Sequence, residues 1–245
     1  MQAWLNYFEW NRKHRDTIPW EGEVNIESHV RETLIRSLQK FQIGESGEGR
    51  KLLRHAIETK DVTYATAIDL FVREEQEHAW LMAEILKRLN APLLTGDWTD
   101  HCFVFLRHLF GLHQELMVLL LPEMIAKHYF RTLHDSTYDP VVWAVCKQIL
   151  RDEEGHVAFH VEFLRRAFAE MSFGRRIVVQ ILWRIAFRAT CLVVMLDHRT
   201  LFRGCNVSLD SFWRDCGKIF DETAAGIFNP AHLPLPTRLM SQPQS

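Results

Sequence analysis

The chain has few cysteines, and none is placed for the common cysteine-based sites. There are five in 245 residues, and no two form a C-x-x-C pair. A zinc ribbon, a rubredoxin-type site and a thioredoxin motif therefore have no support. An odd cysteine count is typical of free thiols in a reducing compartment, and the mixed aromatic and charged segment Met1–Trp20 lacks the apolar core of a signal peptide. We expect a cytoplasmic protein.

The chain also lacks an excess of charge of either sign. Its formal net charge is −2, and the acidic and basic residues are interleaved along the sequence. No basic block favours nucleic acid, and no acidic tail suggests a solvating arm. We expect no nucleic-acid partner.

Glycine and proline are scarce between Glu23 and Phe228, and no alternating strand pattern is present. Apolar residues recur there at three- and four-residue steps, which predicts an all-α fold. Asp61 is the expected N-cap of one helix, and Asp139-Pro140 is an expected break. We expect helices over residues 24–57, 61–90, 101–135, 140–169, 174–200 and 208–226. These divide the chain into an N-terminal extension (1–23), a four-helix bundle (24–170), C-terminal helices packing on it (171–228) and a proline-rich tail (229–245).

One apolar run, 177–196, is near the length needed to span a bilayer. It contains Arg184 and Arg188, which are four apart and therefore share one helix face. Each central arginine costs roughly 2.5–3.5 kcal/mol on membrane insertion. We expect a helix that packs on the bundle with one polar edge, and no membrane contact.

Two similar segments stand out, Arg73–Ala79 and Arg151–Val157. Both read Arg, acid, Glu, any, any, His, and each contains a Glu-x-x-His step. Residues three apart on a helix share a face, so the carboxylate and the imidazole can reach one point. A single step of this kind occurs by chance in a chain of this composition, so the spacing of the surrounding acids matters more.

That spacing repeats. Glu45 precedes the first motif and Glu123 precedes the second, and the two sets differ by 78 positions throughout (45 to 123, 75 to 153, 78 to 156). Two helix pairs that each offer a Glu and a Glu-x-x-His have the ligand inventory of di-iron and di-manganese carboxylate bundles. Four carboxylates in one core would repel each other, and two divalent cations would neutralise them. The predicted metal ligands are Glu45, Glu75, His78, Glu123, Glu153 and His156.

Several residues beside the predicted ligands have open interpretations. Glu74 and Asp152 precede the two motifs, so they either accept the free N–H of the histidine in the other half or are ordinary exposed acids. Pro122, directly before Glu123, bends its helix. The bend either makes room beside the metal for a third partner such as O₂ or substrate, or is a plain kink. His160, one turn after His156, is expected to be a core histidine rather than an added ligand.

The stretches Phe41–Ser46 and Arg151–His156 carry a family resemblance. The first is similar to the Gly-Glu-Ser stretch of rubrerythrins, and the second to the Asp-Glu-x-x-His stretch of ribonucleotide reductase small subunits and multicomponent monooxygenases. The chain thus resembles the ferritin-like di-iron carboxylate superfamily over about residues 24–165. The resemblance implies a ferritin-like four-helix bundle with additional C-terminal helices, Glu45 as a ligand in preference to Glu48, and Asp152 beside the ligands.

The chain departs from that family in two ways. Met82 stands where the reductase small subunit has its radical tyrosine, and the rubredoxin domain of most rubrerythrins is absent. We therefore expect a di-iron oxidoreductase, with Fe/Mn or di-Mn as the alternative metal pairs. Its partners would be O₂, a small organic substrate and an electron donor, and a homodimer is the default assembly. The alternative functions are iron handling or peroxide scavenging, and a non-catalytic helical module.

Overall fold

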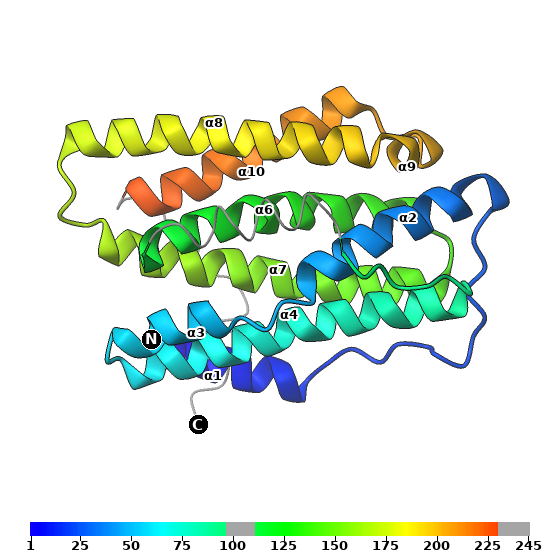
Figure 1. Ribbon diagram of the computed structural model, residues 1–245, viewed down its shortest axis with the longest axis horizontal. Helices are drawn as coiled ribbons and strands as arrows, with labels where there is room; N and C mark the ends of the chain where they lie inside the picture. Colours follow the sequence, from blue (N-terminus) through cyan, green and yellow to red (C-terminus); the bar gives the residue numbers. More distant parts are fainter. Residues whose placement is uncertain (97–110, 230–245) are drawn as a thin grey trace.

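The structure is a computed structural model that describes residues 1–96 and 111–229, and within those ranges it contains helices and no strand. The all-α prediction is confirmed for this part of the chain. Residues 101–110 of the expected third helix, and the expected tail beyond Asn229, lie outside it. In the order of Figure 1, the helices are α1 (Gln2–Lys13), α2 (Ser28–Glu45), α3 (Arg50–Glu58), α4 (Val62–Arg88), α6 (Leu112–Ser136), α7 (Pro140–Ala167), α8 (Phe173–Asp197), α9 (Arg199–Gly204) and α10 (Leu209–Phe228).

Aspartates begin the two helices that carry the Glu-x-x-His motifs. The carboxylate of Asp61 accepts a hydrogen bond from the backbone N–H of Tyr64 at 2.9 Å, so the predicted N-cap of α4 is confirmed. The carboxylate of Asp139 accepts two such bonds, at 3.0 and 2.9 Å, from the first N–H groups of α7. Pro140 takes the first position of α7, where no N–H is needed. Both motifs therefore lie inside helices with well-defined starts.

The expectation of one helix over residues 24–57 is wrong. Helix α2 ends at Glu45, and α3 begins at Arg50. Gly49 between them has φ +60°, and a Cβ there would lie 2.5 Å from a methyl group of Val72. The apolar period continues across this turn, which is why the sequence pattern alone predicts a single helix. The expected helix over 174–200 is similarly divided, into α8 and the short α9.

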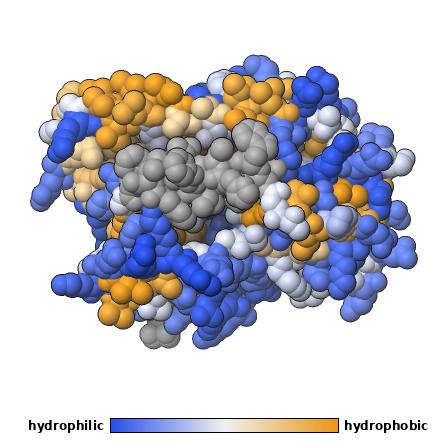
Figure 2. Space-filling model, viewed as in Figure 1, coloured by the Kyte–Doolittle hydropathy of each residue, from blue (hydrophilic) through white to orange (hydrophobic). Residues whose placement is uncertain are grey.

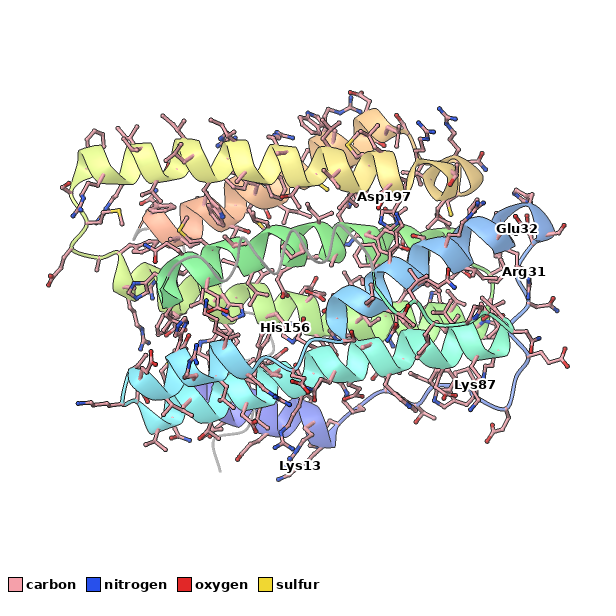
Figure 3. All side chains as sticks on the ribbon, in the orientation of Figure 1. Lys13, Arg31, Glu32, Lys87, His156 and Asp197 are labelled. Carbon is pink, nitrogen blue, oxygen red and sulfur yellow. The ribbon has the colours of Figure 1, made fainter. Side chains whose placement is uncertain are left out.

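Helices α2, α4, α6 and α7 enclose the core that holds the predicted site. Helix α6 packs along α7, α2 packs along α4, and α4 contacts α7. His156 of α7 lies among them in Figure 3. The space between them is filled by buried apolar side chains, including Leu38, Ile68, Met82, Leu116, Phe130 and Ile149. Burial of this apolar surface, at about 25 cal/mol per Å², holds the polar site in place.

The N-terminal segment contributes a helix that packs against α4. The aromatic residues Trp4, Tyr7 and Phe8 of α1 are buried. The Tyr7 side chain fills the space beside Gly155 of α7, where an added Cβ would lie 2.2 Å from the Tyr7 hydroxyl oxygen. Helix α1 is therefore seated next to the second Glu-x-x-His motif, on the side of α7 where that motif has a glycine.

Helix α8 packs on α10 and α6 through a narrow stripe. Its buried residues are Trp183, Phe187 and Cys191, at four-residue intervals. Among the described residues it is the one helix long and apolar enough to cross a membrane, and 17% of its most apolar stretch is buried. The sequence led us to expect a packing helix, and the broad exposed apolar face of α8 was not foreseen.

Candidate metal centre

Four predicted ligands form one compact group. Glu75 and His78 project from α4, Glu153 and His156 from α7, and one ligand atom from each lies within 4.8 Å of all the others. His78, Glu153 and His156 are buried, and Glu75 is half-buried. The three-residue step within each helix brings its carboxylate and imidazole to the same side, and the contact between α4 and α7 brings the two pairs together.

Both histidines direct the same ring nitrogen at this group. Nδ1 of His78 lies 3.7 Å from Glu75 Oε1 and 3.6 Å from Glu153 Oε1. Nδ1 of His156 lies 2.8 Å from Glu75 Oε1 and 3.9 Å from Glu153 Oε2. These contacts are ion pairs that lack hydrogen-bond geometry. Both Nδ1 atoms, Glu75 Oε1 and Glu153 Oε2 are buried, and within the described residues none of the four has a hydrogen-bond partner. Buried polar atoms in native proteins are nearly always satisfied, so this convergence indicates a missing partner that accepts lone pairs.

The two remaining predicted ligands lie at the edge of the group. Oε2 of the buried Glu123, on α6, is 3.5 Å from His156 Nδ1 and has no hydrogen-bond partner among the residues that the structure describes. Glu45 is the last residue of α2, and its carboxylate interacts electrostatically with Glu75, Glu123 and His156. The structure thus brings all six predicted residues to one place, four in the compact group and two beside it.

The outer nitrogens of the two histidines are held by the acids that precede the motifs. Nε2 of His78 lies 3.1 Å from Asp152 Oδ2, and Nε2 of His156 lies 3.0 Å from Glu74 Oε2. Each acid therefore contacts the histidine of the other helix. Both acids are buried, which removes the interpretation that they are ordinary exposed acids. A carboxylate on Nε2 places the proton there and leaves Nδ1 as a lone-pair donor.

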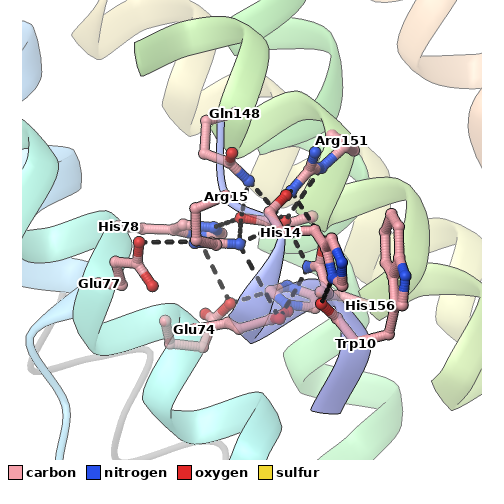
Figure 4. A network of polar contacts seen from close by, with 12 residues as sticks. Trp10, His14, Arg15, Glu74, Glu77, His78, Gln148, Arg151 and His156 are labelled. Atoms are coloured by element: carbon pink, nitrogen blue, oxygen red, sulfur yellow. Dashed lines mark hydrogen bonds and ion pairs between the residues drawn. The ribbon is translucent and has the colours of Figure 1, made fainter. Parts of the chain in front are cut away.

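Helix α1 and the residues after it complete this outer layer, shown in Figure 4. The Asn11 side-chain amide donates to Glu74 Oε1 and to Asp152 Oδ1, both at 2.8 Å. The Arg15 guanidinium lies 2.8 Å from Asp152 Oδ2 and donates to Glu77 at 2.8 Å. Two further residues of α7 contact the network: Gln148 donates to Asp152, and Arg151 donates to Asn11. One amide thus bridges the two acids that hold the two histidines.

Sequence reasoning missed Asn11 and Arg15. A signal for Asn11 was present, since it follows Trp4, Tyr7 and Phe8 at steps of seven, four and three residues, on the buried face of an amphipathic helix. The sequence pattern predicts an N-terminal extension over 1–23, outside the expected bundle.

The ionisation of the group reflects its burial and crowding. Burial and the neighbouring carboxylates raise the pKa of Glu45 and of Glu153 well above the usual value. Burial opposes the charge on Glu75, yet His156 lowers the pKa of this carboxyl group to about 2. Burial also opposes the charge on His156, and Glu75 with its neighbours raises the pKa of the imidazole well above its usual value. Cations bound among these groups would take the place of the protons.

Two neighbouring features remain from the sequence. Helix α6 continues through Pro122 from Leu112 to Ser136, so the proline does not end it. His160 is fully buried, with Phe71 and Phe159 packed against its ring, and in residues 1–96 and 111–229 neither ring nitrogen has a hydrogen-bond partner. Its four-residue offset places it one turn beyond His156 on the same face of α7.

The arrangement is a buried Glu/His group close enough to bind a pair of metal ions. Compared with known proteins, the chain matches no protein-family model, no curated protein and no solved structure. The assignment of a metal centre therefore depends on the geometry of these side chains.

Proposed function

We propose that the protein is a cytoplasmic, O₂-dependent di-iron oxidoreductase built on a ferritin-like bundle of α2, α4, α6 and α7. The observation that carries this proposal is the matched state of the two buried histidines. Each has Nε2 held by the acid of the opposite motif, and each has an Nδ1 that faces the same carboxylates and makes no hydrogen bond within the described part of the chain. The two metal ions would be held by Glu45, Glu75, His78, Glu123, Glu153 and His156.

The donor set fits two divalent ions of the iron or manganese type. Four carboxylates supply four negative charges, which balance two divalent cations, and imidazole and carboxylate are ligands that suit iron. Among the described residues, no cysteine belongs to the group, so the soft-metal and zinc–thiolate alternatives are disfavoured. A pair of Fe(II) ions would supply electrons for the reduction of O₂ and a Lewis-acidic centre for oxidation of a small organic substrate.

The residues of the chain prepare the site for that chemistry. The carboxylates of Glu74 and Asp152 fix the tautomer and orientation of the histidines. Burial of both imidazoles excludes bulk water from the inner side of the group. The guanidinium of Arg15 adds a positive charge beside the buried carboxylate of Asp152, which also accepts hydrogen bonds from Asn11 and Gln148. An electron donor would complete the reaction cycle.

Anaerobic titration with Fe(II), followed by exposure to O₂, tests the proposal. We expect two Fe(II) per chain, and O₂ uptake that depends on the bound iron. His78→Ala should lose at least one iron, while the control variant His29→Ala, which removes an exposed imidazole, should load like the wild type.

Two results would oppose this function. If the folded wild-type chain binds no iron, the remaining interpretation is a non-catalytic helical module. Continued oxidation of Fe(II) far beyond two equivalents would instead show that iron itself is the substrate, as in an iron-handling protein.

A further inference from the structure

The outer side of α8 is a continuous apolar face. Nine large apolar side chains of this helix are 42–79% exposed. Figure 2 shows hydrophobic residues along the upper edge of the molecule, where α8 lies in the orientation of Figure 1. The exposed residues are Phe173, Ile177, Val178, Ile181, Leu182, Ile185, Leu192, Val193 and Leu196.

The two arginines inside this apolar segment do not interrupt the face, because both turn toward α10. Arg184 lies 2.7 Å from Asp221 and over the ring of Phe220. Arg188 donates to the backbone carbonyl of Trp213 at 3.0 Å and lies over its ring. These contacts, with the buried stripe at Trp183 and Phe187, fasten α8 to the rest of the protein. A crossing of the membrane by α8 would require all of them to break.

The exposed residues are spaced as a seam for another helix. Val178, Leu182, Ile185, Ala189, Leu192 and Leu196 are all exposed and follow one another at steps of four, three, four, three and four. This seven-residue repeat is the spacing by which one helix packs along a partner helix. Any one face of a helix has this spacing, so the spacing permits a partner helix, and the choice between a partner helix and a lipid surface rests on the size of the face.

The size of the face agrees with an interface between copies. From their exposed fractions, the large apolar residues of α8 present roughly 800 Å², which is about what one partner contributes to a standard interface. The largest apolar patch on a typical monomer is about 300–600 Å². The face is therefore larger than a monomer usually leaves in contact with water.

We propose that this face binds α8 of a second copy of the chain, in an antiparallel pair. The seam is symmetric about position 187, so this pairing sets Val178 against Leu196 of the partner subunit and Ile185 against Ala189 of the partner subunit. A large side chain then meets a small one at the centre. In a parallel pair Ala189 would meet its own equivalent and leave a void.

Sedimentation equilibrium of the full chain at micromolar concentration tests the pairing. The wild type should be a dimer, and Leu182→Glu should weaken dimerisation by at least ~100-fold, because it buries a carboxylate in each half of an apolar seam. Ile57→Glu on α3 is the matched control, since Ile57 is 60% exposed and Leu182 61%. It should stay dimeric. Both variants should keep the wild-type helix content and the wild-type iron stoichiometry, which separates this proposal from the proposed function.

Cysteine cross-linking tests the orientation. Under mild oxidation, the double variant Val178→Cys/Leu196→Cys should form a covalent dimer, and each single variant should not. A wild type that is monomeric, or a Leu182→Glu variant that remains dimeric, would overturn the proposal. So would a monomer that sediments with lipid vesicles and loses that association in Leu182→Glu, because the face would then be a membrane contact.

Discussion

Replacement of Asn11 by alanine should weaken metal binding at both halves of the site from a position outside the ligand set. The Asn11 amide donates to Glu74 and Asp152, and the opposite oxygen of each acid lies 3.0–3.1 Å from a histidine Nε2. The substitution removes the one donor that both acids share. Asp152 keeps its contacts with Gln148 and Arg15, so Glu74, and the His156 that it orients, should be loosened most.

The size of the effect follows from the hydrogen bonds that are lost. A hydrogen bond to a charged group contributes about 1.5–3 kcal/mol, so the loss of two should lower the free energy of unfolding by about 3–6 kcal/mol. Loss of such outer contacts typically costs a metal site about 10- to 100-fold in affinity, equal to about 1.4–2.7 kcal/mol. Entry of water into the vacated space would reduce the first figure.

Two measurements check this prediction. Thermal or urea unfolding of metal-free protein gives the stability change, and competition with a chelator under anaerobic conditions gives the Kd for Fe(II). The control is Asn6→Ala on the same helix, because Asn6 is exposed and its side chain accepts a hydrogen bond from the exposed Gln2. An Asn11→Ala protein that is less stable but binds Fe(II) with the wild-type Kd would refute the coupling of α1 to the ligands.

Three further outcomes are expected. Gly49→Ala should destabilise the protein by about 2–4 kcal/mol in urea unfolding, because φ is +60° and a Cβ would clash with Val72; Gly47→Ala, with open space around it, should change stability little. Burial lowers the pKa of His160 to about 3, so the unfolded chain binds the extra proton and stability falls as pH drops below about 6.5. Between pH 7 and pH 5, the free energy of unfolding should therefore fall by about 2 kcal/mol less in His160→Leu than in the wild type. An equal fall in the two proteins would contradict this. Removal of metal should lower the Tm, because an ion present at 100 times its Kd stabilises the folded protein by about 2.7 kcal/mol per site. An unchanged Tm would show that no ion was bound.

The helical fold was largely predictable, because its long helices are amphipathic and begin at recognisable caps. Asp61 and Asp139 mark the starts of α4 and α7 in the sequence as they do in the structure. The break between α2 and α3 was not predictable from apolar periodicity, since the turn at Gly49 preserves the phase of the pattern. Its cause is local, a positive φ and the close approach of Val72.

The inner group could be predicted because its two halves repeat one spacing. No comparable repetition marks the outer layer. Glu74 and Asp152 are adjacent to the motifs, so their places followed from helix geometry, but the donors that satisfy them come from α1 and from Gln148.

Two acids buried beside the Glu/His group must each find donors, or the cost of desolvation would displace them. That requirement predicts that donors exist without saying which segment supplies them. Many polar residues could satisfy it equally, and only the packing of Trp4, Tyr7 and Phe8 against the core decides that Asn11 does so. The identity of the outer layer is thus a consequence of tertiary packing, while the identity of the inner group is a consequence of helical period.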